Sequence, residues 1–137
     1  MDKPKLIIGD KAFSTWSLRP WLVLKHCGAD FDEVVIHLDQ PDTAAEIARY
    51  SGAGKVPVLV VDGVSIWDSL AISVWAAERY PNAGLWPADP HARWVARSVT
   101  CEMHSAFGAL RSECGMGTGH PMVGPPGPAK VVSEALA

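Results

Sequence analysis

Two short junctions in the middle of the chain carry groups that could bind a small peptide-like ligand. The first is Val56-Pro57, where proline lacks the N–H that a strand would use. In a cis bond, the N–H and C=O of Val56 would turn outward, where an extended peptide could pair with them. A trans proline that begins an edge strand is the commoner arrangement, and it is the alternative.

The second junction is Asp68-Ser69, at the position where a helix must begin. Helix-start amides and a hydroxyl suit a carboxylate, whereas the aspartate suits an ammonium group. An α-amino acid head group would satisfy both. The alternative is a plain N-cap, because aspartate and serine are frequent there.

The segment between these junctions and just after them has the pattern of a hairpin followed by a helix. Val58–Val61 and Val64–Trp67 are apolar runs that flank Asp62-Gly63, the dipeptide favoured by a type I′ turn. A helix should follow and stop before Pro81. Its expected apolar face consists of Leu70, Val74 and Ala77.

The N-terminal part predicts a strand at Lys5–Gly9, then a polar loop and a helix that Gly28 ends. Three residues could cap this helix, and Pro20 is expected within its first turn. The candidate caps are Ser14, Thr15 and Ser17, and the expected apolar side is Leu18, Trp21, Leu22 and Leu24.

A second strand is expected at Phe31–His37, followed by turn residues at Asp39–Asp42. Thr43 with Glu46 forms a capping-box pattern, which predicts a short helix over 44–50. The predicted order is therefore β-α-β-α-β-β-α, an α/β fold with a mixed sheet and helices on both faces.

The C-terminal part changes composition twice. Residues 82–90 have the composition of a linker, and one long helix is expected over 91–114. Residues 115–137 are rich in glycine and proline, which predicts a disordered tail. The helix carries an apolar stripe at helical spacing, formed by Val95, Val99, Met103, Ala106 and Leu110.

Composition excludes several classes of function. The net charge of −3 and pI near 5.9 disfavour nucleic acid and anionic membrane as partners. No apolar run approaches the roughly 20 residues of a membrane span, and Met1–Pro4 does not begin a signal peptide. The three cysteines lack metal-ligand or C-x-x-C spacing. We therefore expect a cytoplasmic protein with reduced thiols and no metal.

The sequence resembles the cytosolic glutathione transferases, whose N-terminal domain is thioredoxin-like. The resemblance covers roughly residues 5–114. KVPVLVVDGVSIWDSLAISVWAAERYP is similar to the family's Val-Pro, strand, Asp-Ser and helix pattern, and FSTWSLRPWLVL is similar to the start of the serine-type, zeta-like bacterial members. Trp16 stands where the zeta class has cysteine, which argues against a maleylacetoacetate-type isomerase.

The resemblance implies the roles of six residues. Ser14 would face the glutathione sulfur and stabilise its thiolate, and the backbone of Val56, with a cis Pro57, would pair with the cysteinyl unit. The γ-glutamyl end would lie at Asp68 and Ser69, and the glycyl end at Gln40. A plain helix cap is the alternative role of Ser14.

The resemblance further implies an enzyme that attacks a small electrophile with activated glutathione. The apolar stripe predicts that the chain associates with itself as homodimers or larger aggregates, because such a stripe is costly to expose to water. The resemblance divides the chain into a glutathione-binding domain (1–81), a linker (82–90), the first helix of an incomplete all-α domain (91–114) and a tail (115–137). Because the rest of that helical domain binds the electrophile in the family, the alternative is a non-catalytic glutathione-binding or protein-interaction module. A thioredoxin-type oxidoreductase is disfavoured, because no cysteine precedes the first helix.

Overall fold

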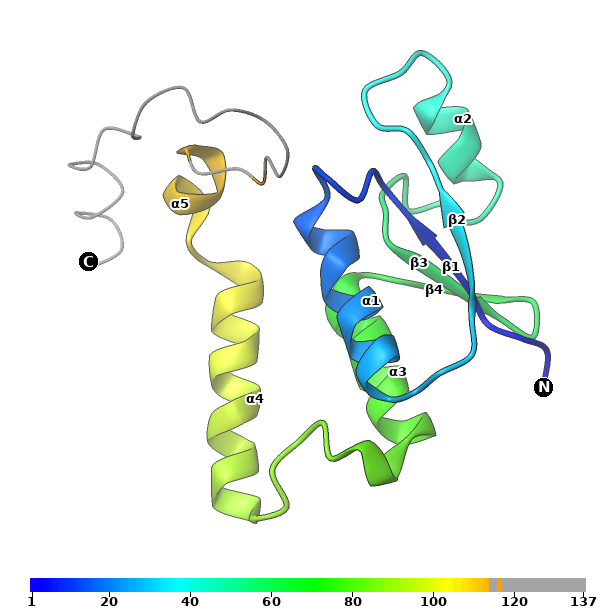
Figure 1. Cartoon of the computed structure of the whole chain (residues 1–137). Helices are drawn as coiled ribbons and strands as arrows, with labels where there is room; N and C mark the ends of the chain where they lie inside the picture. Colours follow the sequence, from blue (N-terminus) through cyan, green and yellow to red (C-terminus); the bar gives the residue numbers. More distant parts are fainter. Residues whose placement is uncertain (114–115, 117–137) are drawn as a thin grey trace. The chain divides into compact units, whose positions relative to one another are not determined.

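The computed structural model describes residues 1–113 and 116, and its contacts divide the chain into two units, Met1–Leu85 and Trp86–Ala137. The first unit has the predicted βαβαββα order (Figure 1). Its elements are β1 (Lys5–Ile8), α1 (Thr15–His26), β2 (Asp32–Val35), α2 (Thr43–Ala48), β3 (Val58–Val61), β4 (Val64–Trp67), α3 (Ser69–Arg79) and the short 3-10 helix η1 (Pro81–Ala83).

The four strands form one mixed sheet in the order β2-β1-β3-β4. β1 runs parallel to β2 and antiparallel to β3, which in turn runs antiparallel to β4. The turn between β3 and β4 has positive φ at both Asp62 (48°) and Gly63 (78°), as a type I′ turn requires. The hairpin prediction is confirmed.

The side chains of β1 alternate between two apolar cores. Leu6 and Ile8 belong to the core on the face covered by α1 and α3, together with Leu24 and Ile72. Ile7 faces the other way and packs with Val58, Ile36 and Ile47, the last of which comes from α2. Helices therefore cover both faces of the sheet, as predicted (Figure 1).

The buried sides of α1 and α3 differ from the predicted apolar faces. On α1 the buried residues are Ser17, Pro20 and Leu24, while Leu18 and Leu22 are exposed. On α3 they are Ser69, Ile72 and Ala76, and none of Leu70, Val74 and Ala77 is fully buried. The two helices pack on the same sheet face and on each other. Large side chains still contribute, because Leu24 and Ile72 are both 0% exposed. The predicted face of α1 is therefore right at Leu24 and wrong at Leu18 and Leu22.

The start of α1 is predicted in part, and the cap of α2 is wrong. Ser14, one of the three candidate caps, does cap α1, which begins at Thr15, but Pro20 lies in the second helical turn rather than the first. Thr43 does not cap α2, because the cap residue is Asp42. The Thr43 hydroxyl instead accepts the Gln40 N–H at 2.9 Å and donates to the His37 carbonyl at 2.6 Å. Thr43 thus stabilises the loop that precedes α2.

The second unit contains two helices where one was predicted over 91–114. α4 (Pro90–Ser105) and α5 (Gly108–Glu113) are separated at Phe107, whose φ of 64° is incompatible with a continuous helix. Arg111 stabilises the break, because its guanidinium donates to the carbonyls of Met103 and Ala106. These carbonyls are left open where α4 ends.

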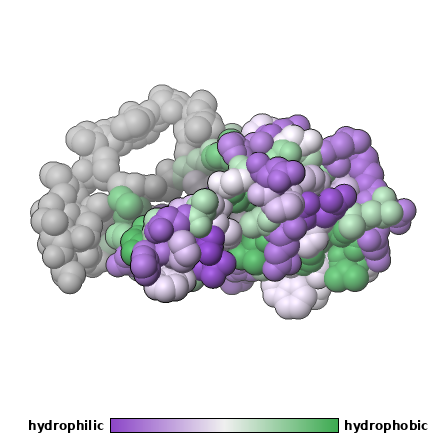
Figure 2. All heavy atoms as spheres, turned by 90° about the horizontal axis from the view of Figure 1, so that it is seen from below, coloured by the Kyte–Doolittle hydropathy of each residue, from purple (hydrophilic) through white to green (hydrophobic). Residues whose placement is uncertain are grey.

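The apolar stripe of α4 and α5 is exposed in this structure. Val95 is 63% exposed and Val99 is 56% exposed, and Met103, Ala106 and Leu110 are also exposed. Figure 2 shows apolar residues beside polar ones on one face of the molecule. The stripe therefore has no packing partner within the described part of its own unit.

The predicted disordered tail at 115–137, apart from Met116, lies outside the residues that the structure describes. In the described part no helix is long and apolar enough to cross a membrane, and no group of three His, Cys, Asp or Glu residues could hold a metal ion. Cys27 and Cys101 are free thiols, and burial raises the pKa of Cys27.

Candidate functional site

The strand register brings four chain segments to one edge of the sheet. The β1–β3 ladder ends at the pair Ile7–Val58, so the next residues outward, Ile8 and Pro57, lie side by side. Val58 also pairs with Trp67, which places Pro57 next to Asp68 on the β4 side. Ile8 pairs with Val35 of β2, so the chain after Val35 starts at the same edge. The predicted site residues all lie on chain segments that start or end at this edge of the sheet.

The peptide bond Val56-Pro57 is cis, as predicted. The backbone N–H and C=O of Val56 make no hydrogen bond to any residue that the structure describes. They lie just before β3 begins, and they are therefore available to an added extended chain.

Asp68 is the cap of α3 and has an unusual backbone conformation. Its φ is 78° and its ψ is 128°, a region that non-glycine residues rarely occupy. Its carboxylate oxygen Oδ1 accepts the N–H groups of Leu70 at 2.9 Å and Ala71 at 3.3 Å. Ser69 follows as a buried residue, and its carbonyl accepts the Ser73 hydroxyl at 2.8 Å. A negatively charged cap and the first amides of α3 thus lie on one short segment, and two of these amides already donate to the Asp68 carboxylate.

Ser14 caps α1 and is linked to a second serine. Its Oγ accepts the Ser17 N–H at 3.3 Å and lies 2.8 Å from the Ser17 Oγ, to which it donates. The Ser17 Oγ in turn accepts the Gly9 N–H at 3.0 Å. Ser14 is 8% exposed and Ser17 is 3% exposed, so both hydroxyls are largely shielded from water.

A small apolar cavity of about 100 Å³ borders Ser14 and Ser17 and is otherwise lined mainly by Ile8, Leu18, Lys11 and Trp21. Glu33 holds one wall in place. It accepts the Trp21 indole N–H at 2.7 Å and pairs with Lys11 at 2.6 Å. The Lys11 ammonium and the Trp21 indole keep the pKa of Glu33 below its usual value.

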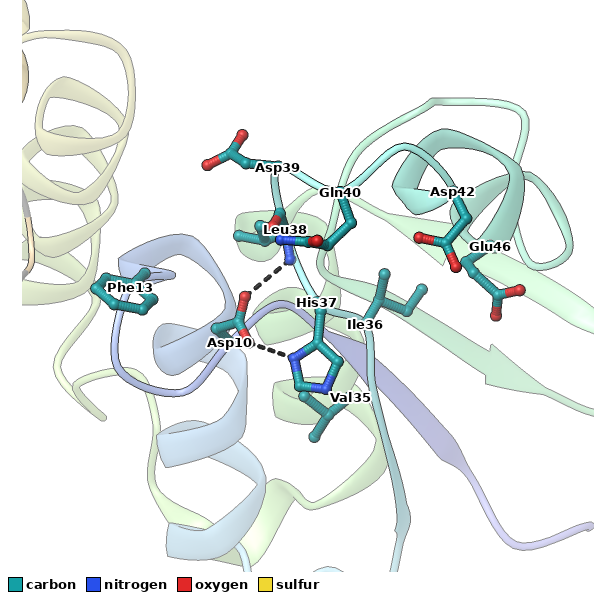
Figure 3. Close-up of a pocket in the computed structure, with 10 residues that line it drawn as sticks. All are labelled: Asp10, Phe13, Val35, Ile36, His37, Leu38, Asp39, Gln40, Asp42 and Glu46. Carbon is teal, nitrogen blue, oxygen red and sulfur yellow. Dashed lines mark hydrogen bonds and ion pairs between the residues drawn. The ribbon is translucent and has the colours of Figure 1, made fainter.

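Gln40 lies in a separate, wider hollow of about 770 Å³ between the β1–α1 and β2–α2 loops (Figure 3). Its side-chain amide donates to the Leu38 carbonyl at 3.3 Å, so it folds back onto its own loop. The carboxylates of Asp39 and Asp42 border the same hollow. The geometry therefore separates Gln40 from the two helix starts.

Asp10 joins the two loops of this hollow. One of its carboxylate oxygens accepts the Leu38 N–H at 2.8 Å, and the other lies 2.7 Å from Nδ1 of His37 (Figure 3). The Leu38 amide, and then the His37 side chain, hold the pKa of Asp10 below its ordinary value of 3.8. Gly9 precedes Asp10, and a Cβ there would come within 2.8 Å of the Leu38 side chain.

The family profile of the glutathione S-transferase N-terminal domain matches residues 13–79. This segment runs from the residue before Ser14 to the end of α3, and so it includes all six predicted site residues. The first unit belongs to the glutathione S-transferase family.

Relatives of the chain are named for two activities within this family. It is 31% identical over 110 residues to a probable maleylacetoacetate isomerase of Caenorhabditis elegans, a match that covers 80% of this chain and 50% of that protein. It is 32% identical over 95 residues to a zeta class glutathione S-transferase of Euphorbia esula, covering 69% and 42% of the two chains. The chain thus spans about half the length of the curated relatives that it matches.

Solved structures of glutathione S-transferases have the same fold. A glutathione transferase homologue from Burkholderia, with bound glutathione, superposes with a TM-score of 0.67 at 26% identity. The superposition covers 81% of this chain and 58% of that one. The resemblance and the thioredoxin-like α/β fold are therefore confirmed.

Three residues that shape this candidate site were not predicted from the sequence as site residues. Asp10 and His37 each follow neighbouring parallel strands, whose carboxyl ends meet at one edge, and that rule could have paired them. Ser17 was considered as a cap, but its contact with Gly9 depends on how α1 docks against β1. No spacing in the sequence indicates that contact.

Proposed function

We propose that the chain binds glutathione along this sheet edge and stabilises its thiol as a thiolate, which then attacks a small electrophile. The observation that carries the proposal is the alignment of Asp68, Pro57, Ile8 and the segment after Val35 across adjacent strands. The edge from β4 to β2 spans three strand spacings, about 14 Å. An extended tripeptide, roughly 10–12 Å long, fits that span.

The chemistry along the edge matches the order of groups in glutathione. At the β4 end, Asp68 suits the α-ammonium of the γ-glutamyl unit, and the N-terminus of α3 suits its carboxylate. The N–H and C=O of Val56, which bond to no described residue, suit the cysteinyl backbone. Gln40 follows at the far end, where the glycyl unit would lie.

Ser14 would act on the sulfur. A cysteine-like thiol has a pKa of about 8.5, so little of it is ionised at neutral pH. A hydroxyl hydrogen bond and the positive end of α1 both favour the charged sulfur. The thiolate is the stronger nucleophile, and its attack on an electrophile is transferase chemistry.

The test combines binding and turnover on the full chain. Calorimetry should detect glutathione binding, and a generic electrophile should be consumed faster with the chain than with glutathione alone. Binding without turnover would support the second candidate function, a non-catalytic glutathione-binding or interaction module. The match to only about half of each relative's length supports this second candidate. Absence of binding would overturn both.

We also propose that the chain forms homodimers in the cytoplasm through the apolar stripe of α4 and α5. Exposure of Val99 and Met103 on this stripe supports the proposal, because contiguous apolar surface is costly in water. In sedimentation experiments Val99→Lys with Met103→Lys should shift dimers towards monomer. Cys101→Lys with Ser105→Lys adds the same two positive charges at the same spacing on the opposite, also exposed face of α4 and should leave the dimer intact. A monomeric parent at micromolar concentration would contradict this.

A further inference from the structure

We propose that Ser17 is a positioning residue that orients and polarises the Ser14 hydroxyl towards the glutathione sulfur. The inference rests on the proposed function, and it deepens that function by adding a second serine to the site. The observation is the chain of contacts from the Gly9 N–H to the Ser17 Oγ and on to the Ser14 Oγ, at 3.0 Å and 2.8 Å.

In the free protein the Ser14 hydroxyl donates to the Ser17 Oγ, so its proton points away from an incoming sulfur. The Ser17 hydroxyl has no acceptor among the described residues other than Ser14. A hydroxyl both donates and accepts, and it rotates to suit its neighbours. The 2.8 Å contact can therefore reverse without movement of either oxygen.

Reversal completes a chain of donors that ends at the sulfur. The Gly9 N–H donates to the Ser17 Oγ, the Ser17 hydroxyl donates to the Ser14 Oγ, and the Ser14 hydroxyl donates to the thiolate. The Ser14 oxygen then accepts both the N–H and the O–H of Ser17, which uses both of its lone pairs. The thiol proton leaves to water, and neither serine loses its own proton.

Burial makes this chain effective. Both serines are at least nine-tenths buried, and hydrogen bonds in series polarise one another in such surroundings. A donor that already accepts two hydrogen bonds is a stronger donor to an anion. Ser17 would thus lower the pKa of the bound thiol, although it acts only through Ser14.

The test measures the pKa of bound glutathione by titrating thiolate absorbance in the complex of the full chain. Ser17→Ala should raise this pKa by about one unit, which is a tenfold loss of thiolate at neutral pH. Ser98→Ala is the matched control, because among the described residues the Ser98 hydroxyl donates to the Trp94 carbonyl of its own helix alone, and it should leave the pKa unchanged. Ser17→Thr and Ser17→Val have the same shape, and only the threonine should keep the parent pKa. This pair carries the test if Ser17→Ala does not fold.

Double substitution separates positioning from independent action. With Ser14→Ala already present, Ser17→Ala should cause no further shift, because Ser17 acts through Ser14. Additive shifts, or an unchanged pKa in both Ser17→Ala and Ser17→Val, would overturn the role of Ser17 while glutathione binding persists. A parent chain that binds no glutathione would overturn the proposed function itself, and the two failures are thus distinguishable.

Discussion

α1 and α3 lie side by side on one face of the sheet, and both begin at the same edge, but their first residues differ in chemistry. α1 is capped by the neutral hydroxyl of Ser14, which is buried and linked to Ser17. α3 is capped by the charged carboxylate of exposed Asp68. The first arrangement suits a developing thiolate, and the second suits a head group that carries both charges. One helix start can therefore promote the chemistry while the other provides affinity.

The largest expected effect is on glutathione affinity, and it follows from a change at Asp68, the cap of α3. Asp68→Ala should weaken glutathione binding by roughly 1.5–3 kcal/mol, about tenfold to 150-fold, because a hydrogen bond to a charged group is lost. Calorimetry with glutathione measures this loss of affinity. Asp89→Ala is the matched control, since Asp89 caps α4 by accepting the Ala92 N–H at 2.8 Å. It should cost stability, about 1 kcal/mol, without loss of affinity. Equal affinities in parent and Asp68→Ala would refute this division of roles.

Ser14→Ala should change the pKa of the glutathione thiol rather than the affinity for glutathione. The pKa of bound glutathione should rise by about one unit, which corresponds to about 1.36 kcal/mol. Affinity at low pH, where the sulfur is protonated, should stay nearly the same. A titration of thiolate absorbance measures the pKa, and calorimetry at low pH measures the affinity. If the pKa does not move, Ser14 is only the cap of α1.

Asp10 predicts a pH dependence of stability in the loops beside these helices. Its pKa is lowered in the folded protein, so its contribution is complete above the unfolded value of about 3.9 and is lost as pH falls through the folded pKa. The urea midpoint of the parent should therefore fall towards that of Asp10→Asn below about pH 4. Glu33, whose pKa is also lowered, titrates in both proteins and cancels from the difference. A gap between the two midpoints that is the same at pH 3 and pH 7 would contradict the prediction.

The smallest effect is expected at Gln40. Its amide already bonds the Leu38 carbonyl at 3.3 Å, and the Asp39 and Asp42 carboxylates nearby do not favour a glycyl carboxylate. Gln40→Ala should weaken glutathione binding by less than about 1 kcal/mol, a few-fold. A loss as large as that of Asp68→Ala, measured in the same calorimetric series, would show that the glycyl end contributes as much as the γ-glutamyl end.

The sequence predicted most of what local chemistry determines. Asp62-Gly63 specified the hairpin, Gly28 ended α1, and the helix after Asp68 began where its cap required. The buried faces of α1 and α3 were predicted only in part: Leu24 is buried as expected, but the buried residues Ser17 and Ala76 are small and carry no strong apolar signal. The break at Phe107 was also missed, since Arg111 satisfies the open carbonyls from outside α4.

The candidate site was likewise predictable where sequence pattern determines it and not predictable where tertiary packing does. Recognition of the family pattern supplied the six residues, and the strand register brought their segments to one edge. The contacts of Ser17 with Gly9 and of Asp10 with His37 depend on tertiary packing, which residue spacing does not encode.

The most direct test of the account is amide hydrogen exchange at Val56 with and without glutathione. The Val56 N–H pairs with no described residue, whereas the Ile36 N–H donates to the Ile8 carbonyl at 2.8 Å and serves as an internal reference. If glutathione lies along the sheet edge between the two helix starts, saturating glutathione should slow exchange at Val56 by direct pairing, whereas exchange at Ile36 should slow only as far as the bound ligand stabilises the fold. Exchange at Val56 that stays equally fast with glutathione bound would contradict the central claim.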